Sequence, residues 1–514
     1  MDTRKRIRRQ QALRPAMGMP LAHRLAVEAP VDQAGQSATH PACPSLPSQG
    51  CRHALVNRLE NQRLARFEEE IKGKFDAIEP FLQKLAGYPA GPDFPEIAQR
   101  LAMEQLGYAL PEKLLHMAWV RGPDMRGLFA AATFSAVHAG VERFAERIRN
   151  ELQAGENIDA FLVDCGFHAV NISACADGRL KGLFSYILRL PAGRLLRWSA
   201  FAGTLFDIDR DVEDWQAAEL LRYREGFPCT ADVPSRYLKI AVYHGSSLDP
   251  THEGCAAHGS NESKAIEAAL QRLEDFRQAI ENAFCCGAST DLLLIGVDTD
   301  TDAIRIHVPD SRGNLNAYRY VDSAVLYRET LGLDADRARL AVYEAIRAAA
   351  ETTGWGQGEG MPHDGMRRLI ATLLINNFSQ IEYVAERFGG WYPDRGHAER
   401  FINVGDGLQE LQLRNLSYYA HLSTVEEGAN DLDVGIKIFT HLLVERGLPI
   451  PMFLHYRYDS RVPGDRERVV SKIQRVAAAI RQRYHVLDQE GLLYLQGSLK
   501  DLPLGSVLEE VKLS

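Results

Sequence analysis

Strand-like and helix-like segments alternate beyond about residue 160, and few folds accommodate such an alternation. The apolar runs, which are typical of β-strands, read FHAVNISA, LKIAVYH and DLLLIGVDTD. A helical pattern, AIEAALQRLEDFRQAIENAF, lies between the last two. Short apolar runs separated by helices favour a sheet with helices packed on it, so the sequence predicts an α/β domain here.

A further region, from about residue 398, repeats this plan with the strand-like IPMFLHYRY and the helical RERVVSKIQRVAAAIRQRY. NISACADGRLKGL, starting at Asn171, has an Asp-Gly pair where INVGDGLQEL, starting at Ile402, has another. The loops differ in length, so a duplication and a chance likeness both stay open. In a duplication, Asp406 matches Asp177, His455 matches His244, Val404 replaces Cys175 and Leu408 replaces Arg179.

The chain before residue 155 has a different pattern. Residues 1–50 are rich in Pro, Ala, Gln, Ser and Arg without sustained periodicity, and basic side chains crowd the start, which is typical of a disordered tail. From about residue 55, apolar residues recur at three- and four-residue spacing, which predicts helices. The predicted organisation is a basic tail (1–50), an all-helical domain (51–155) and two α/β domains (156–397 and 398–514).

Composition excludes some classes of protein. A chain of 514 residues is too long for one hydrophobic core, and its net charge of -9 argues against nucleic-acid binding by the chain as a whole. No run approaches the roughly 18 to 20 apolar residues that cross a bilayer. Eight cysteines are too sparse for a secreted disulfide scaffold, so we expect a reducing compartment and thiols free to bind metal.

Three side chains offer the donors of a catalytic zinc site, which usually has three protein ligands and an open fourth position. Cys175 follows one strand-like run, His244 ends another, and Cys255 lies beyond the loop GSSLDPTHEGC. Each of the three alone is more simply a buried core residue. Asp177 and Arg179 favour the metal site, because a carboxylate and a guanidinium beside Cys175 are costly in a core without a function.

The Cys-x-Asp-x-Arg run with its downstream His and Cys resembles the zinc signature of β-class carbonic anhydrases, although the His-to-Cys gap is longer here. HAVNISACADGRL, YHGSSLDPTHEGCAAHGS, FRQAIENAFCCGAS and RNLSYYAHLSTVEEGANDLDVGIKIF are similar to the carboxysome shell carbonic anhydrases, a divergent branch of that class. The resemblance implies an N-terminal helical domain, a zinc-bearing catalytic α/β domain, and a diverged C-terminal copy without metal.

The resemblance also implies an activity and a location. One Zn²⁺ per chain, held by Cys175, His244 and Cys255, would serve the interconversion of carbon dioxide and bicarbonate inside the carboxysome. Asp177 would orient the attacking hydroxide and Arg179 would hold Asp177 ionised. Candidate proton shuttles are His252, His258 and His397.

Partners follow from the same resemblance. Rubisco is the favoured partner of the basic tail, with carboxysome shell proteins as further partners, and a homodimer or larger homo-oligomer is expected. A scaffold protein with an inert zinc site is the alternative function.

Cys43 and Cys51 could pair as a disulfide or, with His40 and His53, hold a second metal.

Overall fold

The computed structural model describes residues 52–89, 91–151, 158–191, 193, 195–226, 235–283, 288–351, 361–422, 424–502 and 507–513. The predicted basic tail, together with Cys43 and Cys51, lies outside these residues. Among the described helices, none combines the length and apolar character needed to span a bilayer.

Within the described chain, the first sheet has six strands in the order β2-β1-β3-β4-β5-β6. Strands β1 to β4 are parallel to their neighbours, whereas β5 and β6 add an antiparallel edge. The strands are β1 (Ala169–Cys175), β2 (Leu196–Phe201), β3 (Ser235–Gly245), β4 (Ala288–Asp298), β5 (Ile304–His307) and β6 (Tyr320–Asp322).

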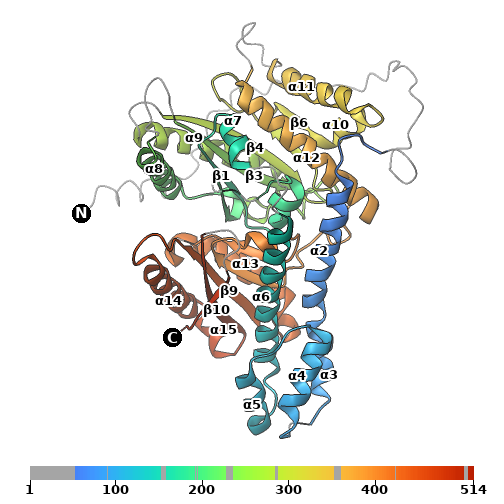
Figure 1. The fold of residues 1–514 in the computed structure, drawn as a ribbon, viewed down its shortest axis with the longest axis vertical. Helices are drawn as coiled ribbons and strands as arrows, with labels where there is room; N and C mark the ends of the chain where they lie inside the picture. Colours follow the sequence, from blue (N-terminus) through green and yellow to red (C-terminus); the bar gives the residue numbers. More distant parts are fainter. Residues whose placement is uncertain are drawn as a thin grey trace. The chain divides into compact units, whose positions relative to one another are not determined.

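Helices cover both faces of this sheet. Side chains of a strand point alternately to opposite faces, and here the apolar side chains of both faces are buried under helices. Leu238 and Ile240 of β3 pack in an apolar cluster with α12, whereas Tyr237 and Ala241 pack in a second cluster with α8 and α9. Figure 1 shows α8 and α9 on one side of the sheet and α10 to α12 on the other. These helices and their short neighbour are α7 (Ile158–Asp164), α8 (Ile208–Arg224), α9 (Glu262–Ala283), α10 (Ser323–Thr330), α11 (Ala335–Glu351) and α12 (Asp364–Phe388).

The second sheet repeats the first. Its described strands follow the order β11-β10-β9-β7-β8, in which β8-β7-β9-β10 form a parallel core like β2-β1-β3-β4. The elements are β7 (Phe401–Gly405), β8 (Ser417–Ala420), α13 (Val425–Leu442), β9 (Ile450–Tyr458), α14 (Asp465–Arg483), α15 (His485–Gln489), β10 (Leu493–Asp501) and β11 (Glu509–Val511).

Strand register supports the residue alignment between the two copies. Ala174 pairs with Val242, which places Cys175 beside Tyr243, one residue before His244. In the second sheet Val404 pairs with Leu454, one residue before His455. Val404 therefore occupies the position of Cys175, and the second copy lacks that thiol.

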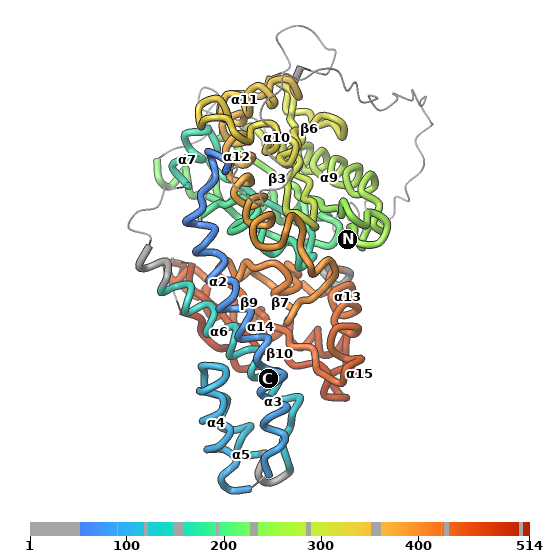
Figure 2. Tube along the Cα trace, turned by 90° about the vertical axis from the view of Figure 1, so that its right-hand side faces the viewer, coloured from blue at the N-terminus to red at the C-terminus, as the bar shows by residue number. Residues whose placement is uncertain are grey.

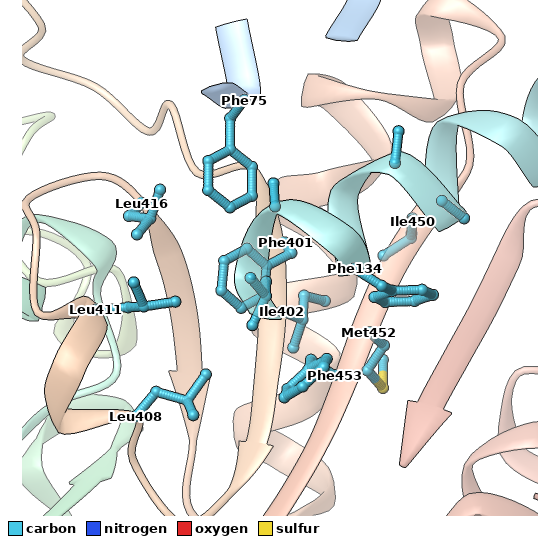
Figure 3. Close-up of a cluster of buried hydrophobic side chains, with 14 of the residues drawn as sticks. Phe75, Phe134, Phe401, Ile402, Leu408, Leu411, Leu416, Ile450, Met452 and Phe453 are labelled. Carbon is cyan, nitrogen blue, oxygen red and sulfur yellow. The ribbon is translucent and has the colours of Figure 1, made fainter. Parts of the chain in front are cut away.

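The N-terminal helices share their core with the second sheet. Phe75 of α2 stacks on Phe401 of β7, and Phe134 of α6 packs against Phe453 of β9 (Figure 3). Figure 2 shows α2 and α6 side by side past β9. The helices are α2 (Arg58–Asp76), α3 (Ile78–Ala86), α4 (Phe94–Gln105), α5 (Glu112–Arg121) and α6 (Met125–Glu151).

The predicted fold class is confirmed: a helical region precedes two α/β sheets, and the second has valine at the position of Cys175. The sequence patterns did not show that one apolar cluster would join α2 and α6 to the C-terminal sheet. The bounds of the four predicted segments stay a prediction.

Candidate metal centre

Two neighbouring strands and one loop bring the candidate ligands together. Cys175 is the last residue of β1, and His244 is the last but one of β3. Because β1 and β3 are parallel neighbours, these ends lie at the same edge of the sheet, where α/β folds place their sites. Cys255 returns to this edge just before the short helix η5 (Ala256–His258).

The three side chains fit a metal ion. The Sγ atoms of Cys175 and Cys255 are 3.8 Å apart, and all ligand atoms of the three residues lie within 4.8 Å of one another. All three residues are buried, and neither ring nitrogen of His244 has a hydrogen-bond partner among the described residues. Two thiols and an unpartnered buried imidazole form a donor set that suits zinc.

The two thiols are electrostatically coupled. Their mutual hydrogen bond, together with burial, raises the pKa of Cys175 well above its usual value. The same hydrogen bond lowers the pKa of Cys255. Cys255 therefore loses its proton more readily than Cys175.

Asp177 and Arg179 form a bidentate pair beside these ligands. Arg179 donates from Nε to Asp177 Oδ1 at 3.0 Å and from a terminal nitrogen to Oδ2 at 2.8 Å. Asp177 also accepts from the Arg179 backbone N–H and so caps the short helix η2 (Gly178–Gly182). Its Oδ2 lies 3.6 Å from His244 Nε2, so the carboxylate faces the candidate ligands.

Asp177 stays ionised although it is buried. Burial by itself would raise its pKa, but the positive charge of Arg179 and its hydrogen bonds to the carboxylate outweigh burial and hold the pKa well below the usual range. Arg179 is in turn fixed by the backbone carbonyls of Glu253 and Arg395.

The C-terminal domain helps to hold the turn after β1. Glu399 accepts a hydrogen bond from Gly178 N–H at 3.1 Å, and Asn415 N–H donates to the Gly178 carbonyl at 2.9 Å. A Cβ atom at Gly178 would lie only 2.2 Å from Glu399 Oε1, so this contact requires glycine. Glu399 was not predicted from the sequence, although the His-x-Glu spacing that begins at His397 is visible there.

The structure separates the three candidate proton shuttles. His397 lies with Asp177 and Glu399, with ligand atoms within 4.8 Å of one another. His258 binds the Gly203 carbonyl, and His252 is exposed and bound to Asp249. Only His397 is thus placed beside the Asp177 carboxylate, and its role as a shuttle stays a prediction.

Comparisons with known proteins agree with the resemblance seen in the motifs. A family model described as the catalytic domain of carboxysome shell carbonic anhydrase matches residues 157–397. Models of the C-terminal and N-terminal domains of the same family match residues 398–514 and 53–145.

Individual relatives cover most of the chain. A carboxysome shell carbonic anhydrase of Halothiobacillus neapolitanus is 56% identical over 92% of this chain and 92% of its own length. A carboxysome shell carbonic anhydrase of Prochlorococcus marinus (strain MIT 9313) is 48% identical over 87% of this chain and 86% of its own length. Another, of Parasynechococcus marenigrum, is 47% identical over 89% of this chain and 78% of its own length. The chain belongs to the carboxysome shell carbonic anhydrase family, as the motifs predicted, and the carboxysome is its location.

Proposed function

We propose that the chain is a zinc enzyme that interconverts bicarbonate and carbon dioxide in the carboxysome and supplies carbon dioxide to Rubisco. The observation that carries this proposal is the buried Cys175, His244 and Cys255 cluster with the Asp177–Arg179 pair against it. The second copy has valine at the Cys175 position, so we infer one zinc per chain.

The two residues of the pair have distinct parts in the proposed reaction. Zinc, when bound, would lower the pKa of a water molecule so that a nucleophile forms near neutral pH. Asp177 would accept a hydrogen bond from that nucleophile and orient it toward the carbon of carbon dioxide. Arg179 binds both Asp177 oxygens and thereby fixes the direction of the carboxylate and keeps it ionised.

His397 offers a route for the proton that hydration of carbon dioxide releases. Its Nδ1 is 2.9 Å from Glu399 Oε1, and about a quarter of its side chain reaches solvent. Although burial lowers the pKa of His397, Asp177 and Glu399 raise it to about 9. Among the three candidates, we infer that His397 carries the proton from the candidate site to bulk water.

The pH dependence of hydration follows from these groups. Asp177 has a pKa well below its usual range and stays ionised from pH 6 to 9, so it adds no change there. His397 loses its proton only as pH approaches about 9. Two thiolate ligands would also leave zinc less positive than three imidazole ligands would, so the attacking water should be less acidic than in a three-histidine site. We expect kcat for hydration to rise from pH 6 to 9 in stopped-flow assays, and a flat profile would contradict both assignments.

A scaffold protein with an inert zinc site is the alternative. A closed structural site normally has four protein ligands, whereas three cluster here among the described residues. A carbon dioxide hydration assay on the purified chain, with and without a strong chelator, separates the two functions. Chelator-sensitive activity supports the enzyme, and zinc-loaded protein without activity supports the scaffold.

We also propose that the chain forms a homodimer or larger assembly and that its basic tail binds Rubisco, with carboxysome shell proteins as further partners. The first residues of this tail carry a local positive charge, opposite in sign to the net charge of the whole chain. The basic residues are Arg4, Lys5, Arg6, Arg8 and Arg9. Such a segment suits an acidic surface.

Deletion of residues 1–50 should abolish Rubisco binding and leave hydration activity intact, because none of the candidate site residues belongs to this segment. Binding to Rubisco can be measured by bio-layer interferometry at increasing salt concentrations, with the full-length chain as the reference. Salt-sensitive binding that survives the deletion would refute the tail as the binding segment.

A further inference from the structure

Lys181 ends in an unusual environment. It belongs to η2, the turn that Asp177 caps, and the residue is only 2% exposed. Its Nζ atom lies 4.4 Å from the ring centroid of Trp198 and 4.2 Å from that of Tyr419. The two centroids are 4.7 Å apart, so the amine contacts a pair of adjacent rings, one from each α/β sheet. Among the described residues, Nζ has no hydrogen-bond partner.

The other buried lysines of the described chain are satisfied. Lys239 donates to Asn171, Ser173 and Asp211, and Lys500 pairs with Glu410. A buried ammonium group normally has such partners, because desolvation of an unpaired charge is costly. Lys181 is therefore the exception that needs a chemical explanation.

Burial shifts the acid–base equilibrium of this amine. Desolvation lowers the pKa of Lys181 to about 7. The two rings attract an ammonium ion and offset part of this effect. A sizeable share of Lys181 therefore carries a free lone pair on Nζ near neutral pH, which exposed lysines do not.

An unpartnered hydrogen-bond donor lies on a ring that contacts the amine. The indole nitrogen of Trp198, whose ring flanks Nζ, is buried and unpartnered among the described residues. A buried donor without an acceptor thus lies on one of the two rings that contact the Lys181 amine.

We propose that Lys181 is a carbamate-forming site for carbon dioxide. The Nζ lone pair attacks the carbon of carbon dioxide and forms a C–N bond, while one C=O π pair moves onto oxygen. One N–H proton leaves to solvent, so the product is a lysine N-carboxylate with a single negative charge and no change in oxidation state.

The new carboxylate supplies an acceptor for the unpartnered Trp198 N–H. The site rests on the proposed function only for its local supply of carbon dioxide, which the reaction would release beside the same turn. The modification would then report the carbon dioxide concentration at the Asp177–Arg179 turn.

The test uses the full-length, zinc-loaded protein in ¹³C-bicarbonate near pH 7. Carbon-13 NMR should show a carbamate signal distinct from bicarbonate and carbon dioxide, because exposed lysines are almost wholly protonated at this pH. Trapping of carbamates with an alkylating oxonium salt, followed by mass mapping, should place the label on the Lys181 peptide and not on the Lys239 peptide.

Lys181→Arg should lose the signal, and the exposed control Lys264→Arg should keep it. If circular dichroism shows that Lys181→Arg is misfolded, Lys181→Met can replace it, because methionine removes the amine and keeps an apolar side chain. The mapping of the label on the wild-type protein does not depend on any variant. A wild-type protein with no carbamate signal, or with label only on the N-terminal amine, would overturn the proposal. Hydration activity measured on the same samples keeps this outcome separate from a failure of the proposed function.

Discussion

Replacement of Cys175 by alanine is expected to abolish zinc binding and carbon dioxide hydration together. Cys175 supplies one of three clustered donors, and a two-donor remainder cannot hold zinc at catalytic affinity. The loss of the buried sulfur should itself cost about 1 kcal/mol of folding stability, as buried substitutions typically do. Elemental analysis measures the zinc content per chain, and stopped-flow assays measure the rate of carbon dioxide hydration.

Cys165→Ala is the matched control. Cys165 is also a buried free thiol, but it belongs to no cluster of potential metal ligands among the described residues. We expect this variant to lose a similar amount of stability and to retain both zinc and activity. Stoichiometric zinc in Cys175→Ala would refute the assignment of Cys175 as a ligand.

Asp177→Asn is expected to keep zinc but lose turnover. Asparagine caps a helix as well as aspartate does, so η2 and the metal ligands should keep their positions. The neutral amide, however, cannot act as the ionised acceptor that Arg179 holds in place. Loss of such a preorganised contact usually lowers kcat by about 10²-fold to 10³-fold.

Asp406→Asn tests whether this effect belongs to the site. Asp406 follows β7 as Asp177 follows β1, but there the Asp side chain binds the Arg457 backbone N–H. Because the second copy lacks the Cys175 equivalent, we expect Asp406→Asn to leave kcat unchanged. An equal loss of kcat in both variants would indicate a general structural effect, and unchanged kcat in Asp177→Asn would remove Asp177 from the reaction.

Local sequence patterns sufficed for the elements that carry the site. The run LKIAVYH lies within β3, and IPMFLHYRY coincides with β9. Strand periodicity is local, so it can be found without knowledge of the fold. The Asp177–Arg179 pair was visible for the same reason, since only two positions separate its members.

Contacts between distant segments could not be predicted in this way. Glu399 binds Gly178 across 221 positions, and no local pattern encodes such a contact. Proximity in sequence was also misleading for the histidines. His252 is near His244 in the chain but exposed, whereas the distant His397 lies beside Asp177. The core shared by α2, α6 and the C-terminal sheet depends on chain topology in the same way.

The most direct test is a titration of metal-free protein with zinc, with hydration activity followed at each addition. We expect activity to rise linearly and to stop at one zinc per chain, because only the first α/β domain carries the Cys175, His244 and Cys255 cluster among the described residues. Activity that is complete before zinc is added, or that needs two zinc ions per chain, would contradict the proposed site.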